Sequence, residues 1–234
     1  MKQALAQIIS KRVKNGEVIG LGSGTTTEIA IEQIGKRVLD EGLNVFGVPT
    51  SLRSAKVAAA NGINVCDIRV VDSIDWAFDG ADEVDPDLNL MKGRGAAMLV
   101  EKIVASQAKS LTIIVTEEKI VKKLGEKFAI PIEVVGQAAL LAESEFQKLG
   151  ATEISLRSAD RKYGEVITDS GNLVFDVVFP VMDFALQSKL KLIPGVVETG
   201  LFLGFSPEVL VATQAGIYAL TKDDSGLVQR TELS

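Results

Sequence analysis

The sequence predicts an α/β protein with a parallel sheet and a smaller inserted α+β domain. Short apolar segments alternate with helical patterns in the order β-α-β-α-β over residues 17–68, which is typical of a parallel sheet covered by helices. From Pro131 the order changes to strands, a hairpin and two helices. Two apolar segments, 209–212 and 217–220, then resemble strands that return to the first sheet.

The elements of the first domain follow from apolar periodicity and from the residues that punctuate it. Leu5, Ile8 and Ile9 have helical spacing, and Asn15-Gly16 ends that helix. The expected helices cover residues 3–13, 25–39 and 51–61, with a further one from about 96. The expected strands cover residues 17–22, 44–48, 63–68, 74–78 and 111–116.

The inserted domain has the pattern of a small antiparallel sheet with helices. We expect strands at 132–135, 152–156 and 196–203, helices at about 137–149 and 181–190, and a hairpin turn at about 168–172. The predicted domains are therefore residues 1–130 plus 206–234, and residues 131–205. The polar tail after Lys222 is expected to be loose.

Composition and charge exclude several classes of function. The chain has 234 residues, of which 47% are hydrophobic, so it can bury a substantial core. Its net charge is −6 and it contains no evident basic patch, which argues against a nucleic-acid partner. We find no signal peptide and no apolar segment long enough to span a membrane. The single cysteine, Cys66, fits a reducing cytoplasm and is expected to be buried.

The absence of histidine limits the available chemistry. It removes Ser-His-Asp catalysis, Cys-His catalysis and histidine metal sites. Acid–base catalysis near neutral pH must then use carboxylates or lysines whose pKa values are shifted by their surroundings.

A glycine-rich loop joins the first predicted strand to a helix. Gly22 and Gly24 allow the backbone to approach a ligand closely, and the amides at the helix start favour an anion. Thr25 occupies the place of the third glycine of the dinucleotide fingerprint, and no Gly-Lys-Ser/Thr follows. A single phosphate fits better than a nucleotide. The alternative is a tight turn capped by Ser23, Thr25 and Thr26 without a ligand.

Two carboxylates follow the strand at 74–78, in the segment D-G-A-D-E. Asp79 and Asp82 should face the same crevice as the glycine loop, because ligands bind at the carboxyl ends of parallel strands. The alternative is that both residues only form a turn. A calcium loop is rejected, since Leu90 and Ala96 replace its required glycine and glutamate. We assign Glu83, Asp85 and Asp87 to turn formation.

One further acid and two lysines complete the candidate set. In a helix, the neighbours of Glu101 on its own face are apolar, so we expect a raised pKa and a usable base. The alternatives are a glutamate at the rim of the helix or one paired with a distant lysine. Lys92 lies beside Gly93 and Gly95, and Lys119 follows a strand end from which it could reach an anion.

These motifs together resemble the ribose-5-phosphate isomerases of the A type over nearly the whole chain. The segments that carry the resemblance are G-L-G-S-G-T-T (20–26), D-G-A-D-E (79–83), K-G-R-G-A-A (92–97), E-K-I (101–103), E-E-K (117–119), P-I-E-V (131–134) and I-P-G-V-V (193–197). One departure is Arg94, at a position where we expect glycine in this family.

The resemblance implies interconversion of ribose 5-phosphate and ribulose 5-phosphate in the pentose phosphate pathway, without cofactor or metal. It also implies a Rossmann-like domain with a small α+β domain, and a homodimer or homotetramer. The implied general base is Glu101, and Lys92, Asp79 and Asp82 take the other catalytic positions. The implied substrate-binding residues are Ser23, Gly24, Thr25, Thr26, Asp79, Gly80, Ala81, Asp82, Lys92, Gly93, Arg94, Gly95 and Lys119.

Three other functions compete with this one. The first is a metal-dependent hydride shift, which the lack of histidine disfavours. The second is a sugar-phosphate-sensing regulatory module of related fold, which needs the glycine loop but not Glu101. The third is acyl-CoA transfer on a related fold, which also uses a glutamate.

Overall fold

The computed structural model describes residues 1–233, whose contacts divide into two compact units. The first unit consists of Met1–Ala81, Val100–Ile120 and the chain from Phe205 onward, and the second of Asp82–Leu99 and Val121–Gly204. Residues 82–99 and 121–130 thus lie in the second unit, although the sequence analysis placed them in the first domain. For residues 82–99 this follows from strand pairing, because the strand Leu90–Met91 pairs on one side with Glu83–Val84 and on the other with Leu201–Phe202.

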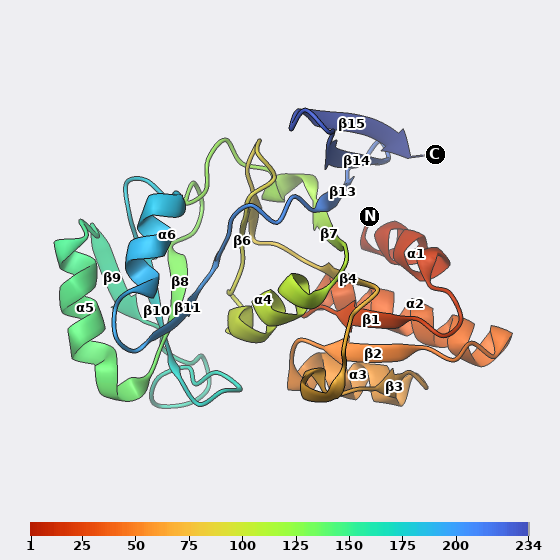
Figure 1. Cartoon of the computed structure of the whole chain (residues 1–234), viewed down its shortest axis with the longest axis horizontal. Helices are drawn as coiled ribbons and strands as arrows, with labels where there is room; N and C mark the ends of the chain where they lie inside the picture. Colours follow the sequence, from red (N-terminus) through yellow and green to blue (C-terminus); the bar gives the residue numbers. More distant parts are fainter. Residues whose placement is uncertain (234) are drawn as a thin grey trace. The chain divides into compact units, whose positions relative to one another are not determined.

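In the described part of the chain, the first unit contains an eight-stranded sheet (Figure 1). Six neighbouring strands are parallel, and the two strands that come last in the chain pair antiparallel at one edge. This arrangement confirms the predicted α/β class. The strand order is β15 (Val228–Leu233), β14 (Ile217–Lys222), β13 (Glu208–Ala212), β7 (Leu111–Thr116), β4 (Trp76–Asp79), β1 (Val18–Leu21), β2 (Phe46–Pro49) and β3 (Asn64–Val65).

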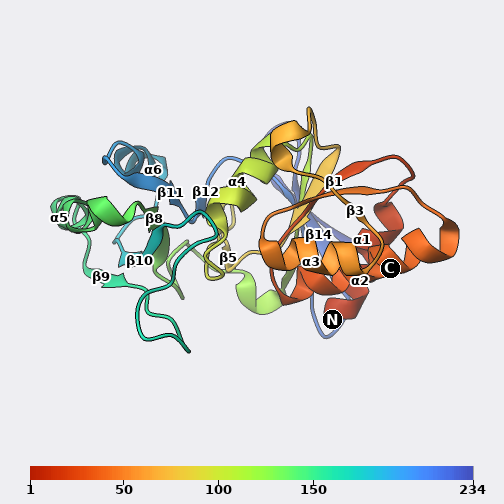
Figure 2. The same cartoon turned by 90° about the horizontal axis from the view of Figure 1, so that it is seen from below.

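Alternating residues of β1 serve the two faces of this sheet. Ile19 and Leu21 belong to the core beneath α1 (Lys2–Arg12), α2 (Thr25–Glu41) and α3 (Leu52–Ala60), which lie together in Figure 2. Gly20 faces the other way, where an added Cβ would come within 2.6 Å of Val104 on α4 (Met98–Gln107). The glycine therefore allows α4, the helix that carries Glu101, to pack closely on the sheet.

The second unit contains a four-stranded antiparallel sheet in the order β11-β8-β10-β9. Phe146 of α5 meets Phe175 of β10 edge-on in its core. Thr168 and Asn172 close the predicted hairpin turn, since the Thr168 amide donates to the Asn172 carbonyl at 2.9 Å. The elements are β8 (Ile130–Val134), η3 (Gly136–Ala138), α5 (Ala139–Lys148), β9 (Glu153–Leu156), β10 (Leu173–Val178), α6 (Phe184–Lys191) and β11 (Val196–Thr199).

A three-stranded sheet in the second unit holds the acidic segment. It consists of β5 (Glu83–Val84), β6 (Leu90–Met91) and β12 (Leu201–Phe202). Glu83 was assigned to a turn, but it is fully buried in β5 and accepts hydrogen bonds from the amides of Gly125, Lys127 and Phe128. Asp85 does form a turn, because its Oδ1 accepts from the amides of Asp87 and Asn89.

Two other expectations were wrong. The tail after Lys222 is not loose, because β15 pairs with β14 over six residues. Its polar side chains fit the edge of a sheet, where charges discourage further strand pairing. Cys66 is partly exposed rather than buried, since β3 ends at Val65 and η1 (Ile68–Val70) follows at the surface.

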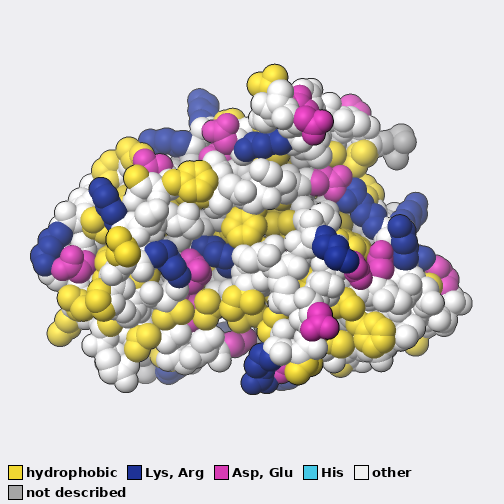
Figure 3. All heavy atoms as spheres, viewed as in Figure 1, with side chains coloured by type: hydrophobic (Ala, Val, Ile, Leu, Met, Phe, Trp, Pro, Cys, Tyr) yellow, Lys and Arg dark blue, Asp and Glu magenta, His cyan; other side chains and the backbone are white. Residues whose placement is uncertain are grey.

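Basic and acidic side chains are interspersed on the face of the molecule shown in Figure 3. Among residues 1–233, no helix combines the length and apolar character that a membrane span requires.

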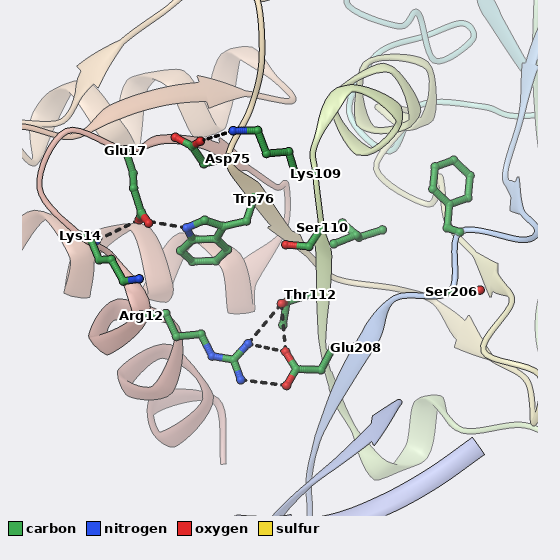
Figure 4. A pocket seen from close by; sticks show the side chains of 12 residues that line it. Arg12, Lys14, Glu17, Asp75, Trp76, Lys109, Ser110, Thr112, Ser206 and Glu208 are labelled. Carbon is green, nitrogen blue, oxygen red and sulfur yellow. Dashed lines mark hydrogen bonds and ion pairs between the residues drawn. The ribbon is translucent and has the colours of Figure 1, made fainter. Parts of the chain in front are cut away.

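At the amino ends of β1, β4, β7 and β13, charged side chains line a pocket of about 480 Å³ and bind each other (Figure 4). Arg12 makes a two-pronged ion pair with Glu208, which also accepts from the Thr112 hydroxyl. Lys109 pairs with Asp75 at 2.8 Å. These bonds join α1 to two strand starts, and they neutralise much of the charge in the pocket.

The Arg12–Glu208 pair predicts a pH-dependent contribution to stability. Burial raises the pKa of Glu208. The hydrogen bonds and charge of Arg12, together with the Thr112 hydroxyl, lower the pKa by more than burial raises it, so it lies below the usual 4.5. A carboxyl whose pKa is depressed on folding stabilises the protein above its unfolded pKa, and this contribution is lost as the pH falls through the folded value. Urea unfolding of Glu208→Gln and wild type should therefore differ most near neutral pH and converge at an acid pH below the folded pKa, which lies under 4.5. An equal difference at both pH values would contradict this assignment.

Candidate active site

The glycine loop and Asp79 meet at the carboxyl ends of β1 and β4. Leu21 and Phe78 are register partners, so Gly22 and Asp79 follow side by side, and an added Cβ on Gly22 would lie 2.3 Å from Asp79 Oδ1. The Ser23 amide donates to the same oxygen at 3.1 Å, and the Gly80 amide donates at 2.7 Å. Asp79 thus makes turn hydrogen bonds while lying, nine-tenths buried, next to the predicted anion-binding loop.

The loop itself has the form that an anion site requires. Gly24 is the N-cap of α2 and has φ of 121°, a conformation that favours glycine. Because it has no side chain, it does not cap the first amides of the helix. The helix begins at Thr25, so its first amides and the helix dipole are directed at this loop. The Ser23 hydroxyl is 2.8 Å from that of Thr50 and donates at 2.6 Å to that of Ser51, which caps α3. Capping of α3 therefore accounts for Ser51.

Lys2 is a functional candidate that the sequence analysis missed. Its Nζ donates to the Thr25 hydroxyl at 2.7 Å, so a cation stands at the start of α2. The packing of α1 against α2 brings it there. Nothing near Lys2 in the sequence marks it, because the two residues are brought together only by the fold.

Glu101 is buried on α4, with 7% of its surface exposed. It lies in the first turn of that helix, one turn before Val104, which packs over Gly20 of β1. The glutamate is therefore an interior residue of the first unit and not a rim residue. Lys119 ends η2 (Glu117–Lys119), directly after β7, and is half-exposed.

The remaining predicted residues belong to the second unit. Lys92 follows β6 and is 3% exposed, with its Nζ 5.6 Å from the centre of the Phe202 ring. Asp82 Oδ2 accepts from the Arg94 amide at 3.2 Å, so this carboxylate is tied to the K-G-R-G turn. The Arg94 side chain is exposed and lies over the Phe128 ring at 4.3 Å.

Among residues 1–233, no group of three or more histidine, cysteine, aspartate and glutamate side chains is arranged to hold a metal ion. The structure brings Ser23 together with Asp79, and Asp82 together with the 93–95 turn. A glycine loop at the carboxyl ends of parallel strands is the place where α/β enzymes bind their ligands, so the first unit has the architecture of an α/β enzyme.

Comparison with known proteins gives the family. Residues 46–216 match the model of ribose 5-phosphate isomerase A, also called phosphoriboisomerase A. The ribose-5-phosphate isomerase A of Methanothermobacter thermautotrophicus is 46% identical over 222 residues, which cover 94% of this chain and 97% of that protein. The protein of the same name from Thermococcus kodakarensis is 42% identical over 220 residues, which cover 93% of this chain and 96% of that one.

Solved structures agree with the sequence comparison. The structure of ribose 5-phosphate isomerase A from Methanocaldococcus jannaschii matches with a TM-score of 0.90 and 42% identity, covering 94% of this chain and 98% of that one. A D-ribose-5-phosphate isomerase solved in complex with phospho-erythronic acid matches with a TM-score of 0.90 and 39% identity, covering 94% and 97%. The chain belongs to the ribose 5-phosphate isomerase A family and is an enzyme of that type.

Because Gly22 touches Asp79, enlarging it should damage the site. We expect Gly22→Ala to destabilise the protein by about 1–3 kcal/mol through overpacking. Displacement of Asp79 and the loop should also lower isomerase kcat/KM by roughly 10²-fold. Gly136→Ala is a matched control, because an added Cβ there meets its nearest neighbour only at 4.0 Å. Activity of Gly22→Ala equal to that of the control would show that the close contact has no role in turnover.

Proposed function

We propose that this protein interconverts D-ribose 5-phosphate and D-ribulose 5-phosphate through an enediolate, with Glu101 as the general base. The observation that carries the proposal is the 46% identity to a ribose-5-phosphate isomerase A over nearly the full length of both proteins. The buried carboxylate of Glu101 supports the assigned base, because low solvent access suits a group that holds a proton between two carbons.

The phosphate is proposed to bind at the start of α2. Backbone amides of residues 24–26, the hydroxyls of Ser23, Thr25 and Thr26, and the ammonium group of Lys2 supply donors there. Lys119 is a further candidate for this anion. The phosphate acts as a handle, whose binding energy orients the reacting end of the sugar.

The chemistry begins with ring opening, which needs proton transfer at the ring oxygen, and Asp82 with Asp79 is proposed to carry it out. Glu101 then removes the proton from C2 and returns it to C1. Over the reaction the aldehyde oxygen at C1 gains a proton and the hydroxyl oxygen at C2 loses one. A single carboxylate can serve both carbons because they are adjacent.

Negative charge develops on the oxygens at C1 and C2 in the enediolate. Lys92 and the amides of the 93–95 turn are proposed to stabilise it, together with the 79–82 segment, including Gly80 and Ala81. In other enzymes one such donor is worth roughly 3–4 kcal/mol. Lys92 suits this role because it is buried, where a charge interacts more strongly than in water.

We place this reaction in the pentose phosphate pathway, in the cytoplasm, without metal or cofactor, and with a homodimer or homotetramer as the working assembly. The single cysteine and the carboxylate-based chemistry are consistent with that setting.

The first experiment follows ketose formation from ribose 5-phosphate after exhaustive chelation, in wild type and Glu101→Gln. The amide has nearly the same shape but cannot accept the C2 proton, so kcat should fall by about 10²–10⁴-fold. KM should change little. Glu41→Gln is the control, because Glu41 is an exposed helical glutamate.

Each of the other possible outcomes favours a different function or a different base. Binding of ribose 5-phosphate by wild type without conversion favours the sensing module. Loss of wild-type turnover on chelation favours a metal-dependent hydride shift, and reaction with CoA thioesters favours acyl transfer. Full turnover in Glu101→Gln would move the base to another carboxylate, with Asp82 next.

Lys2 provides a separate test of the phosphate site. Removing a charge-assisted hydrogen bond costs about 1.5–3 kcal/mol, so Lys2→Ala should raise KM by roughly 10- to 100-fold. It should also weaken inhibition by inorganic phosphate, with a smaller effect on kcat. Lys11→Ala, on the same helix and exposed, is the matched control. An unchanged KM and phosphate inhibition in Lys2→Ala would remove Lys2 from the site.

A further inference from the structure

The K-G-R-G turn is built onto the small sheet of the second unit. The Lys92 amide donates to the Gly200 carbonyl at 2.9 Å, and the Gly200 amide donates to Pro131 of β8 at 2.7 Å. Gly93, with φ of 107°, lies so close to Pro131 that an added Cβ would be 3.1 Å from that ring. The turn therefore takes its position from β8 and from the chain around residue 200.

Arg157 adds a second support from the β9 edge of the four-stranded sheet. It follows β9, and its side chain is only 15% exposed. Its Nε and one terminal nitrogen bind both oxygens of Asp176, which lies opposite Pro131 in the β10–β8 register. The other terminal nitrogen donates to the carbonyls of Gly93 at 2.8 Å and Arg94 at 3.1 Å.

These two carbonyls belong to the peptide units that carry the amides of Arg94 and Gly95, which are part of the proposed site. In a trans peptide the C=O and N–H groups point in opposite directions, and no peptide here is cis. Fixing the Gly93 carbonyl therefore orients the Arg94 amide, which donates to Asp82 Oδ2 at 3.2 Å. Fixing the Arg94 carbonyl orients the Gly95 amide in the same way.

Arg157 differs from Lys92 because its charge is not proposed to act on the substrate. Asp176 neutralises it through two bonds, so Arg157 contributes no net charge to the turn. What remains is a planar fork with fixed directions, which suits holding two carbonyls. Lysine, with one nitrogen on a flexible stem, cannot reproduce this set of bonds.

We infer that Arg157, held by Asp176, is a positioning residue of the isomerase site, which orients the 93–95 peptides and the Asp82 carboxylate. The inference rests on the proposed function, and it adds residues that the family motifs of the sequence did not single out. It assigns Arg157 no contact with substrate. Its effect should therefore fall on turnover more than on binding.

The test compares Arg157→Ala, Arg157→Lys and wild type with ribose 5-phosphate, at temperatures where circular dichroism shows all to be folded. Loss of turn geometry should lower kcat of Arg157→Ala by roughly 10²-fold with KM within about threefold, and Arg157→Lys should be intermediate. Arg157 lines a cleft of about 460 Å³, so added guanidinium can reach the vacated place and should raise kcat in a saturable manner.

Arg12→Ala is the matched control, because it also removes a two-pronged arginine–carboxylate pair, but one in the first unit at the amino ends of its strands. Its kcat should stay near that of wild type and should not respond to guanidinium. An equal fall in the control, a kcat of Arg157→Ala within about threefold of wild type, or a fall that guanidinium does not reverse would each overturn the inference. Should Arg157→Ala not fold, Arg157→Lys and Asp176→Asn decide by the same criterion.

Hydrogen exchange of the peptide 92–97 separates this inference from the proposed function. Faster exchange in Arg157→Ala, reversed by guanidinium, supports positioning, and unchanged exchange overturns it. A wild-type protein that does not isomerise ribose 5-phosphate would refute the proposed function, and the exchange result would still stand on its own.

Discussion

The contact between Gly22 and Asp79 is the constraint on which the glycine loop and the Asp79 carboxylate of the first unit depend. Adjacent parallel strands end together, so the residue after β1 lies against the residue after β4. Only a glycine leaves room for the carboxylate, which then accepts from the Ser23 amide. The conformation of the loop and the orientation of the Asp79 carboxylate are therefore coupled. A change in either one moves the other.

The chain from Asp79 to Glu101 links the two units and carries groups in both. It leaves β4 in the first unit, enters the second at Asp82, forms β5, β6 and the K-G-R-G turn, and returns along α4. The second unit is thus more than an attachment. Buried Glu83 ties this segment to the backbone at 125–128, and Gly200 and Arg157 bind the backbone of the turn and give it a defined shape.

The sequence predicted what local pattern controls and missed what only the fold brings together. Alternating apolar segments and glycine turns revealed the main strands and placed the candidate residues at strand ends. Strands of two residues, such as β5 and β12, are too short for a period, so the three-stranded sheet was not foreseen. Lys2 and Arg157 carry no local signal. Their roles depend on partners 23 and 64 residues away.

The two ends of the main sheet use acids in different ways. At the amino ends, side chains neutralise each other, as in the Arg12–Glu208 and Lys109–Asp75 pairs, and the result is support for the strand starts. At the carboxyl end, backbone amides donate to Asp79. An amide orients a carboxylate without exchanging a proton with it near neutral pH. Acids held in this way are fixed in direction yet remain able to take part in proton transfer, which a protein without histidine must obtain from carboxylates.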